Sequence, residues 1–423
     1  MHIRKGFWAI TAIAVVCFVF AILSGEIILY RIFYFDLFLL IVGFVWTLFS
    51  RNSVQLIRYS RNRHRQVGMI FEERFQVTNA GHFWILWVEV IDQSKLPGSD
   101  ASRVLFMIKP HSNRVYQANT RMTHRGEYLL GPTLIRLGDP FGMFFVERVF
   151  PGKDNLLTIP LQYDIDHFSS PAGQLSGGKA IRTSGQDTTP YASSVREYRI
   201  GDSLSRIHWR STARRQKLMV KEFDQDPQSN ISILLDANHS SQILLSENSA
   251  FEENDRESMI QRNVKISLPL DTFEYAVTSA ATIVKYFIRL GRAVGFASMG
   301  SKLIYLTAER GERQLGKIIE SLAFIDSNGN LPILGLVQSQ EANLVKGSTV
   351  ILVSSSPLKE LEICMDYLLL RGLKMVVVYI DPRSFTEKKS TPHLSELFRS
   401  KGVEFYWIKK NDSIRSVLGF SGE

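Results

Sequence analysis

The chain has 423 residues, of which 45% are hydrophobic and 22% charged, a composition that excludes a disordered protein and allows two or three domains. Its two cysteines exclude a disulfide framework. The net charge is +9, but residues 1–66 contain eight Lys or Arg and only two acids. Most of the excess therefore lies beside an apolar N-terminus, where membrane topology explains it better than nucleic-acid binding.

Two apolar stretches near the N-terminus predict a transmembrane helical hairpin. Residues 7–24 contain no charge and residues 32–49 contain only Asp36, and each stretch is long enough to cross about 30 Å of hydrocarbon. Basic residues flank both outer ends, so we expect two spans in the cell membrane with the main domains facing the cytoplasm. A cleaved signal peptide is the competing interpretation of the first stretch. We expect Asp36 near the end of its span, within reach of water.

The rest of the chain predicts three further parts. The hairpin and a basic juxtamembrane segment take residues 1–66, and residues 67–165 alternate apolar and polar side chains between turn residues, which predicts a β-rich, sandwich-like domain. Residues 166–229 form a connector. From 230 to 423, apolar strands alternate with helical stretches, which predicts an α/β domain with a doubly wound, mostly parallel sheet. The expected fold class is therefore multidomain.

The first predicted strand of the α/β domain ends in the sequence DANHSS, which contains the oxygen-bearing side chains of Asp236, Asn238 and Ser240. In doubly wound sheets, ligands bind at the carboxyl ends of strands where the strand order reverses. One carboxylate and two neutral oxygens suit Mg²⁺, which takes few protein ligands and keeps several waters. The alternative interpretation is a strand-to-helix turn capped by Asp236 and Ser240.

The spacing Asp-x-Asn-x-Ser resembles the metal-ion-dependent adhesion site of von Willebrand factor A domains. That resemblance implies a bound divalent metal completed by a carboxylate of the partner, and so a docking site without catalysis. The chain departs from the family's pattern at the end of a later strand, where Ser354, Ser355 and Ser356 stand in place of an expected aspartate.

The densest polar cluster lies between Arg196 and Lys221, with eight Lys or Arg residues, two acids, a His and a Trp. Its middle predicts a short helix with Asp202 as the N-cap and Arg206 one turn later. The following KLMVKEF alternates as a strand. We expect the cluster to fix the angle between the β domain and the α/β domain through Arg–carboxylate pairs, with some arginines left for a partner.

The stretch from Arg196 to Asp224 resembles the signature of the bacterial domain-of-unknown-function family 58. The matching residues are Arg196, Tyr198, Gly201, Asp202, Arg206, Ile207, His208, Trp209, Ser211, Ala213, Arg214, Lys221, Glu222 and Phe223. The resemblance implies a membrane-anchored protein with a β domain and a divergent von Willebrand A-like domain, commonly encoded beside MoxR-type AAA+ ATPases and transglutaminase-like membrane proteins. It implies an adaptor or scaffold that docks such an ATPase or a related membrane complex through its von Willebrand A-like domain.

Two other functions stay open. Asp202 and His208 could form the orienter–base pair of a hydrolytic enzyme, but the sequence has no Gly-x-Ser-x-Gly, HExxH or phosphate-binding loop, so we do not expect an enzyme. The basic run 196–221 could bind nucleic acid. Glu197, Asp202 and Glu222 interrupt or flank its positive charge, however, so we expect no nucleic-acid partner.

Overall fold

The computed structural model describes residues 2–60, 63–152, 154–169, 192–199, 207–223, 230–243, 271–386 and 398–419. The chain divides into two compact units, the first running from Met1 to Ile159 and the second beginning at Pro160.

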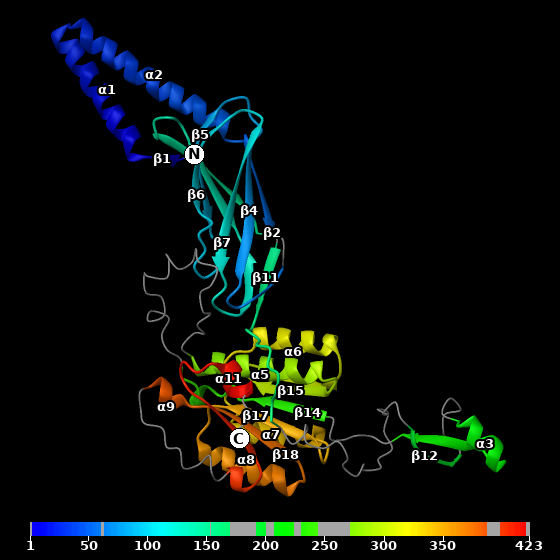
Figure 1. Cartoon of the computed structure of the whole chain (residues 1–423). Helices are drawn as coiled ribbons and strands as arrows, with labels where there is room; N and C mark the ends of the chain where they lie inside the picture. Colours follow the sequence, from blue (N-terminus) through cyan, green and yellow to red (C-terminus); the bar gives the residue numbers. More distant parts are fainter. Residues whose placement is uncertain are drawn as a thin grey trace. The chain divides into compact units, whose positions relative to one another are not determined.

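The first unit begins with an antiparallel pair of apolar helices, α1 (Lys5–Ser24) and α2 (Ile27–Ser50), drawn in blue in Figure 1. Gly25 ends α1 in the left-handed conformation, with φ at 72°, and its N–H donates to the carbonyl of Ala21 at 2.9 Å. This turn lets the chain reverse within two residues. Both helices are long and apolar enough to cross a membrane, and they indicate that the chain associates with one.

The second helix starts at Ile27 instead of residue 32, which changes the position of Asp36. Asp36 lies about 14 Å from the start of a helix about 36 Å long, so it is closer to the middle of the span than to its end. Its side chain is 9% exposed, and its Oδ2 has no hydrogen-bond partner among the described residues. The expectation that Asp36 reaches water at the end of a span is therefore wrong for this structure.

A β-sandwich makes up the rest of the first unit. One sheet has the strand order β1-β10-β9-β5-β6, a second has β2-β4-β7, and a small third sheet has β3-β11-β8. Along β4, residues alternate between exposed and buried, so that Phe71, Phe75 and Val77 enter the core. The strands are β1 (His2–Ile3), β2 (Val54–Ser60), β3 (His64–Gln66), β4 (Ile70–Asn79), β5 (Ile85–Asp92), β6 (Arg103–Ile108), β7 (Ser112–Arg121), β8 (Gly126–Leu130), β9 (Thr133–Gly138), β10 (Phe144–Phe150) and β11 (Asp154–Ile159).

Strands β2 and β3 correct a predicted boundary, because residues 54–66 were expected to form a basic juxtamembrane segment. Arg58 of β2 points into the sandwich. Its Nε and Nη2 donate to the Glu73 carboxylate at 2.6 and 2.9 Å, and its Nη1 donates to Asp92 at 2.9 Å. Both carboxylate side chains are 1% exposed. After the helical hairpin, the β domain therefore resumes at Val54, and this cluster ties β2 and β4 of one sheet to β5 of the other.

The second unit contains a six-stranded sheet with the order β16-β15-β14-β17-β18-β19. In chain order this is 3-2-1-4-5-6, the doubly wound arrangement, with only β16 antiparallel to its neighbour. The predicted α/β fold class is confirmed. The strands are β14 (Asn230–Leu235), β15 (Ala293–Met299), β16 (Leu303–Glu309), β17 (Thr349–Ser354), β18 (Lys374–Ile380) and β19 (Glu404–Ile408).

Helices cover both faces of this sheet, as Figure 1 shows. Helices α5 (Thr272–Arg289) and α6 (Glu312–Phe324) pack together, and α5 lies against β14, β15, β17 and β18. Asp271 starts α5 by accepting a hydrogen bond from the N–H of Phe273 at 2.8 Å. On the opposite face, α7 (Ile333–Ser339) and α8 (Leu358–Leu370) close a core that includes Leu234 and Leu352. The α/β unit also contains two shorter helices, α9 (Pro382–Phe385) and α11 (Ile414–Gly419).

The family-like stretch forms a separate substructure, named here the signature arm, comprising residues 192–199 and 207–223. Strands β12 (Ala192–Glu197) and β13 (Met219–Phe223) pair antiparallel, and α3 (Trp209–Arg215) lies between them in the chain. The predicted strand over KLMVKEF is confirmed as β13. The predicted helix starts later than expected, at Trp209, and its N-cap is His208. Asp202 and Arg206, the predicted cap and its partner, lie outside the described residues.

Candidate functional site

The strand order places a switch point between β14 and β17, the two central strands from which the chain proceeds in opposite directions. Ligands of doubly wound sheets bind in the crevice beyond the carboxyl ends of such strands. Asp236 follows β14 directly, and Ser354 to Ser356 end and follow β17. The backbone joins the two strand ends, because the N–H of Asp236 donates to the carbonyl of Val353 at 2.9 Å.

Asp236 is 1% exposed, and its carboxylate accepts four hydrogen bonds. Oδ1 accepts from the N–H of Asn238 at 3.0 Å. Oδ2 accepts from three hydroxyls, those of Ser354 at 2.6 Å, Ser356 at 2.7 Å and Ser241 at 3.1 Å. Three hydroxyl donors and one N–H satisfy most of the acceptor capacity of an ionised carboxylate. Hydrogen bonds from both sides therefore fix the position of the Asp236 carboxylate.

The other two predicted ligands do not converge on Asp236. Asn238 is 8% exposed, and its Oδ1 accepts from the N–H of Ser240 at 3.2 Å, which caps the short 3-10 helix His239–Ser241. Ser240 is exposed, and Ser241 instead provides the hydroxyl that reaches Asp236. Sequence reasoning missed Ser241 because the spacing analogy favoured Ser240. The one-turn 3-10 helix, which brings position 241 back toward the strand end, leaves no clear sequence signal.

Gln242 extends this network to a third element. Its Nε2 donates to the carbonyl of Asp236 at 3.1 Å, and its Oε1 accepts from Ser355 at 3.2 Å and from Thr272 at 2.8 Å. The ends of β14 and β17 and the start of α5 are therefore held by one set of hydrogen-bonded side chains, all buried except Gln242, which is half-buried. Such a fully satisfied polar network makes the local structure rigid.

This donor set does not fit a hydrated Mg²⁺ ion. Mg²⁺ binds through carboxylate oxygens that face the ion, and here both oxygens of Asp236 already accept hydrogen bonds from the protein. Within the described residues, no group of three His, Cys, Asp or Glu side chains could hold a metal. The geometry matches the alternative interpretation of a capped turn for Asp236, but the second cap is the Asn238 side chain and not Ser240. Mg²⁺ binding itself stays a prediction to be tested by titration.

Two ionisable groups of α8 lie close enough to interact electrostatically with Asp236. Burial raises the pKa of Glu360, and the negative charge of Asp236 raises it further, while a hydrogen bond from the N–H of Leu334 acts in the opposite direction. Burial raises the pKa of the Cys364 thiol to about 12, with the charges of Glu360 and Asp236 adding to it. Cys364 is fully buried and protonated at neutral pH, so it is not a nucleophile.

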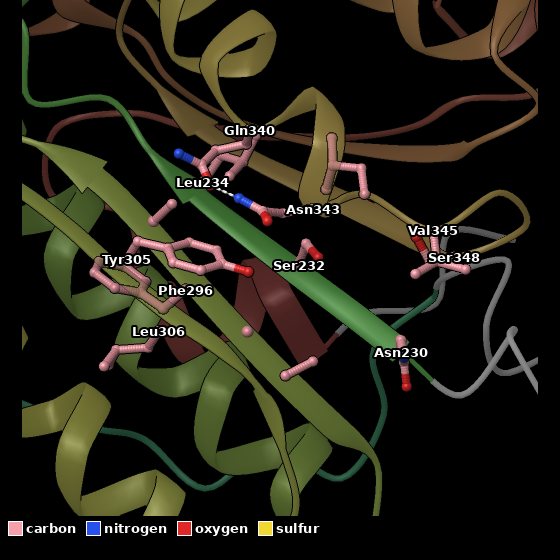
Figure 2. A pocket seen from close by; sticks show the side chains of 14 residues that line it. Asn230, Ser232, Leu234, Phe296, Tyr305, Leu306, Gln340, Asn343, Val345 and Ser348 are labelled. Atoms are coloured by element: carbon pink, nitrogen blue, oxygen red, sulfur yellow. Dashed lines mark hydrogen bonds between the residues drawn. The ribbon is translucent and has the colours of Figure 1, made fainter. Parts of the chain in front are cut away.

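A small cavity lies on the sheet face formed by β14 and β15, and none of the Asp236 network residues lines it (Figure 2). Ser232 and Tyr305 line it, together with Gln340 and Asn343, whose amide groups are joined by a hydrogen bond of 3.0 Å. Its volume is about 30 Å³. That is room for one or two waters, and ligand sites measure ~300–1,000 Å³. The cavity is not a substrate site.

The signature arm holds His208 in a structural position. The Nδ1 of His208 lies 2.7 Å from the Ser211 hydroxyl and accepts from the N–H of Ser211 at 3.2 Å, so the imidazole caps the first turn of α3. The N–H of His208 donates to the carbonyl of Met219 at 2.8 Å, which ties the cap to β13. This nitrogen is therefore occupied by the helix start. The alternative of an Asp202–His208 orienter–base pair is not tested, because Asp202 lies outside the described residues.

Beyond His208, the arm presents exposed aromatic and basic side chains. Trp209 is 68% exposed, and Arg210, Arg214 and Arg215 of the same helix are also exposed. Within the described residues, no ion pair involves these three arginines. Elsewhere in the arm, Lys217 pairs with Glu197 at 3.0 Å, with both side chains about two-thirds exposed. Asp202 and Arg206 lie outside the described residues, so the Arg–carboxylate pairing expected from the composition of this cluster stays a prediction.

The remaining signature residues form the backbone frame of the arm. Arg196 and Lys221 lie in the paired strands, where Arg196 is opposite Val220 and Lys221 is opposite Val195. The N–H of Tyr198 donates to the carbonyl of Leu218 at 2.9 Å, which extends the pairing beyond β12. Glu222 lies in β13. Gly201, like Asp202 and Arg206, lies outside the described residues.

Comparisons with known proteins agree with the signature. Residues 194–261 match the model of the family described as "Protein of unknown function DUF58". The chain is 24% identical over 245 residues to the uncharacterized protein YeaD of Bacillus subtilis (strain 168), a match that covers 58% of this chain and 54% of that protein. The chain thus spans about half the length of the curated relative it matches.

Two solved structures show distant similarity. A von Willebrand factor type A protein from Catenulispora acidiphila is 10% identical with a TM-score of 0.28, over 47% of this chain and 42% of that one. The CARDB domain of the PF1109 protein from Pyrococcus furiosus is 12% identical with a TM-score of 0.20, over 26% of this chain and 96% of that one. The fold assignment rests on the strand order and not on these scores. The signature stretch lies within the segment that matches the DUF58 model, and the chain is therefore similar to this family of proteins of unknown function over residues 194–261.

Proposed function

We propose that this chain is a membrane-associated docking protein and that its partner-binding surface is the signature arm. The observation that carries the proposal is the 68% exposure of Trp209 at the start of a helix with three exposed arginines. Trp and Arg are the side chains that most often dominate binding energy at protein interfaces. Without a partner, the exposed Trp209 ring would place apolar surface in water and contribute nothing to the stability of the fold.

The arm is a better candidate for docking than the switch point of the sheet. An adhesion-type site needs a metal with an open coordination position for the partner's carboxylate, and the oxygens of Asp236 are taken by hydroxyl donors. Ser354, Ser356 and Asp236 are all at most 1% exposed, so a partner would have to open the network to reach them.

The chemistry of the arm favours an acidic protein surface as the partner. Arg210, Arg214 and Arg215 offer planar guanidinium groups that bind carboxylates in bidentate fashion. By the family resemblance, the partner we propose is a MoxR-type AAA+ ATPase, held near the membrane by the helical hairpin. The chain would then act as an adaptor, without catalytic chemistry of its own.

Binding of the full chain in lipid nanodiscs to the MoxR-type ATPase encoded by the same genome tests the proposal. Trp209→Ala should weaken the Kd by about tenfold or more, as expected for a central interface Trp. Arg214→Ala should weaken binding and reduce its dependence on salt. Phe324→Ala is the matched control, because Phe324 is an aromatic residue 53% exposed on α6 of the same unit.

The melting temperature separates docking from folding. Because Trp209 is exposed, Trp209→Ala should leave the melting temperature unchanged while binding is lost. Unchanged binding in the Trp209→Ala/Arg214→Ala double variant would exclude the arm as the docking surface. Retention on DNA that falls steeply with salt, and that both variants reduce, would instead support the nucleic-acid alternative.

A further inference from the structure

The end of the β-sandwich next to the helical hairpin carries a group of loops named here the rim: residues 80–84, 109–111 and 139–143. These loops join β4 to β5, β6 to β7 and β9 to β10. Two of them lie beside the last turns of α2. The Phe83 ring lies 6.1 Å from the Trp46 ring and 5.4 Å from the Phe49 ring. A Cβ at Gly43 would come within 2.9 Å of the Met143 side chain, so the 139–143 loop reaches Gly43.

Buried hydrogen bonds hold the loops of the rim in place. The side chain of Asn79 is fully buried, and its Nδ2 lies within hydrogen-bonding distance of the carbonyls of Phe83, Ile108 and Lys109 at 2.8 to 3.2 Å. Its Oδ1 accepts from the N–H of Gly81 at 2.9 Å. In the third loop, the buried carboxylate of Asp139 accepts from the N–H groups of Phe141 and Phe144.

The length of the hairpin sets the depth of the rim in a bilayer. If the rim stayed in water, α2 would have only residues 27–43 to cross the hydrocarbon, about 26 Å of helix. The hydrocarbon core is about 30 Å thick. Helix α1 places the rim at the same depth. Its whole length is about 30 Å. The N–H of Arg4, next to the start of α1, donates to the carbonyl of Met143 in the rim at 2.9 Å. The rim must therefore lie at the boundary between hydrocarbon and headgroups.

The exposed side chains of the rim suit that boundary. Phe83, Trp84 and Phe141 are 49%, 38% and 50% exposed, and aromatic side chains of this kind concentrate at membrane interfaces. Lys109 is exposed, with its Nζ 5.7 Å from the centre of the Trp84 ring, and Arg51 is exposed just after α2. The three loops contain one carboxylate, Asp139, and it is buried. The rim therefore presents apolar and positive groups together.

We propose that the rim is a membrane-binding surface that inserts Phe83, Trp84 and Phe141 among lipid headgroups and binds anionic phospholipid through Arg51 and Lys109. The β-sandwich then rests on the bilayer instead of being tethered at a distance from it. This proposal rests on the membrane association of the hairpin and is independent of docking through the signature arm.

Site-directed fluorescence on the full chain in nanodiscs tests the proposal. An environment-sensitive label is attached at Phe141→Cys, at His111→Cys, which keeps all three aromatic side chains, and at Leu129→Cys as the control. Leu129 is 51% exposed on β8, which pairs with β11 at the end of the sandwich away from the hairpin in Figure 1. The background carries Cys17→Ala and Cys364→Ala, and each labelled protein must keep the melting temperature of that background.

Lipids that carry a nitroxide near the headgroup should quench the labels at 141 and 111 several-fold more than the label at 129, and aqueous iodide should show the reverse order. In discs with anionic lipid, Arg51→Gln/Lys109→Gln should expose the 111 label to iodide more than the parent does, since each cation near an anionic surface contributes about fivefold in binding. Labels at 141 and 111 that iodide quenches as fully as the label at 129 would overturn the proposal. Equal shielding in neutral and anionic discs, unaffected by Arg51→Gln/Lys109→Gln, would overturn its electrostatic part.

Discussion

The hydroxyl of Ser354 donates to the carboxylate of Asp236 at 2.6 Å, across 118 positions of the chain, and so joins the ends of the two central strands of the sheet. Ser356 repeats the contact at 2.7 Å. In a sheet of this order, the same crevice is the usual position for a ligand. Here the protein's own hydroxyls occupy it, which makes the switch point a structural joint.

If the Asp236 network is a structural joint, removing its acceptor should destabilise the α/β unit. Asp236→Ala leaves three buried serine hydroxyls and the N–H of Asn238 without their acceptor, and we expect a loss of about 2–4 kcal/mol in the free energy of unfolding. Urea unfolding of the detergent-solubilised chain measures this change. Ser240→Ala is the control and should change stability by less than about 0.5 kcal/mol, because Ser240 is exposed. Equal effects of the two substitutions would contradict the network.

The hydrogen bonds to Asp236 predict, against the Mg²⁺ binding expected from the sequence, that the chain does not respond to divalent metal. Ligands that bind only the folded state raise the melting temperature by an amount that grows with the logarithm of their concentration above Kd. We therefore expect Mg²⁺, Mn²⁺ or EDTA at millimolar concentrations to leave the melting temperature unchanged. Calorimetric titration of Mg²⁺ into the parent chain, with Asp236→Ala beside it, measures binding directly. A binding isotherm that disappears in the variant would restore the adhesion-type site.

Sequence reasoning placed most of the α/β domain correctly because its elements are strongly periodic. The apolar runs that became β14, β17 and β18 and the amphipathic stretch that became α5 carry their own signal. Two elements gave weaker signals and were not predicted. Strand β16 lies at an edge and exposes every second side chain, and α7 is a seven-residue helix.

Long-range pairing explains the remaining errors. Arg58 looked like one of several juxtamembrane cations, because its partners Glu73 and Asp92 are 15 and 34 positions away. Asp236 was found from its place after a strand, but Ser354 and Ser356 were noted only as a departure from a metal site. Their role as hydrogen-bond donors to Asp236 depends on the adjacency of β14 and β17, which the local pattern does not contain.

The Arg58 cluster predicts a large loss of stability on removal of its cation. Arg58→Met leaves the carboxylates of Glu73 and Asp92 buried without a counter-charge, and we expect a loss of about 3–5 kcal/mol at neutral pH. Chemical denaturation measures it. Arg63→Met is the control, because its pair with Asp154 is mostly exposed and should contribute less than about 1 kcal/mol. A loss below that of the control would mean that the cluster is solvated.

Acid should partly rescue Arg58→Met. Burial already raises the pKa of Glu73 above its ordinary value, while Arg58 opposes the rise. Without Arg58, the pKa of Glu73 in the folded chain rises further. The stability that protonated Glu73 contributes is then fully present below its unfolded-state pKa and is lost as pH rises through its folded-state pKa. The deficit relative to the parent should therefore shrink as pH falls toward 4. A deficit independent of pH would assign the loss to packing alone.

Glu360 predicts a second pH dependence, in the α/β unit. Burial and the nearby charge of Asp236 raise its pKa in the folded chain. Its contribution to stability is therefore complete below the unfolded-state pKa of about 4.3 and is lost as pH rises through the folded-state pKa. Glu360→Gln removes this titration and keeps an acceptor for the N–H of Leu334. Relative to the parent, the variant should gain stability at pH 7 compared with pH 4.

Glu309→Gln is the opposite control, because its hydrogen bond with Lys317 lowers the pKa of Glu309. A difference between the Glu360→Gln variant and the parent that does not change with pH would show that the Glu360 carboxylate is solvated and does not interact with Asp236.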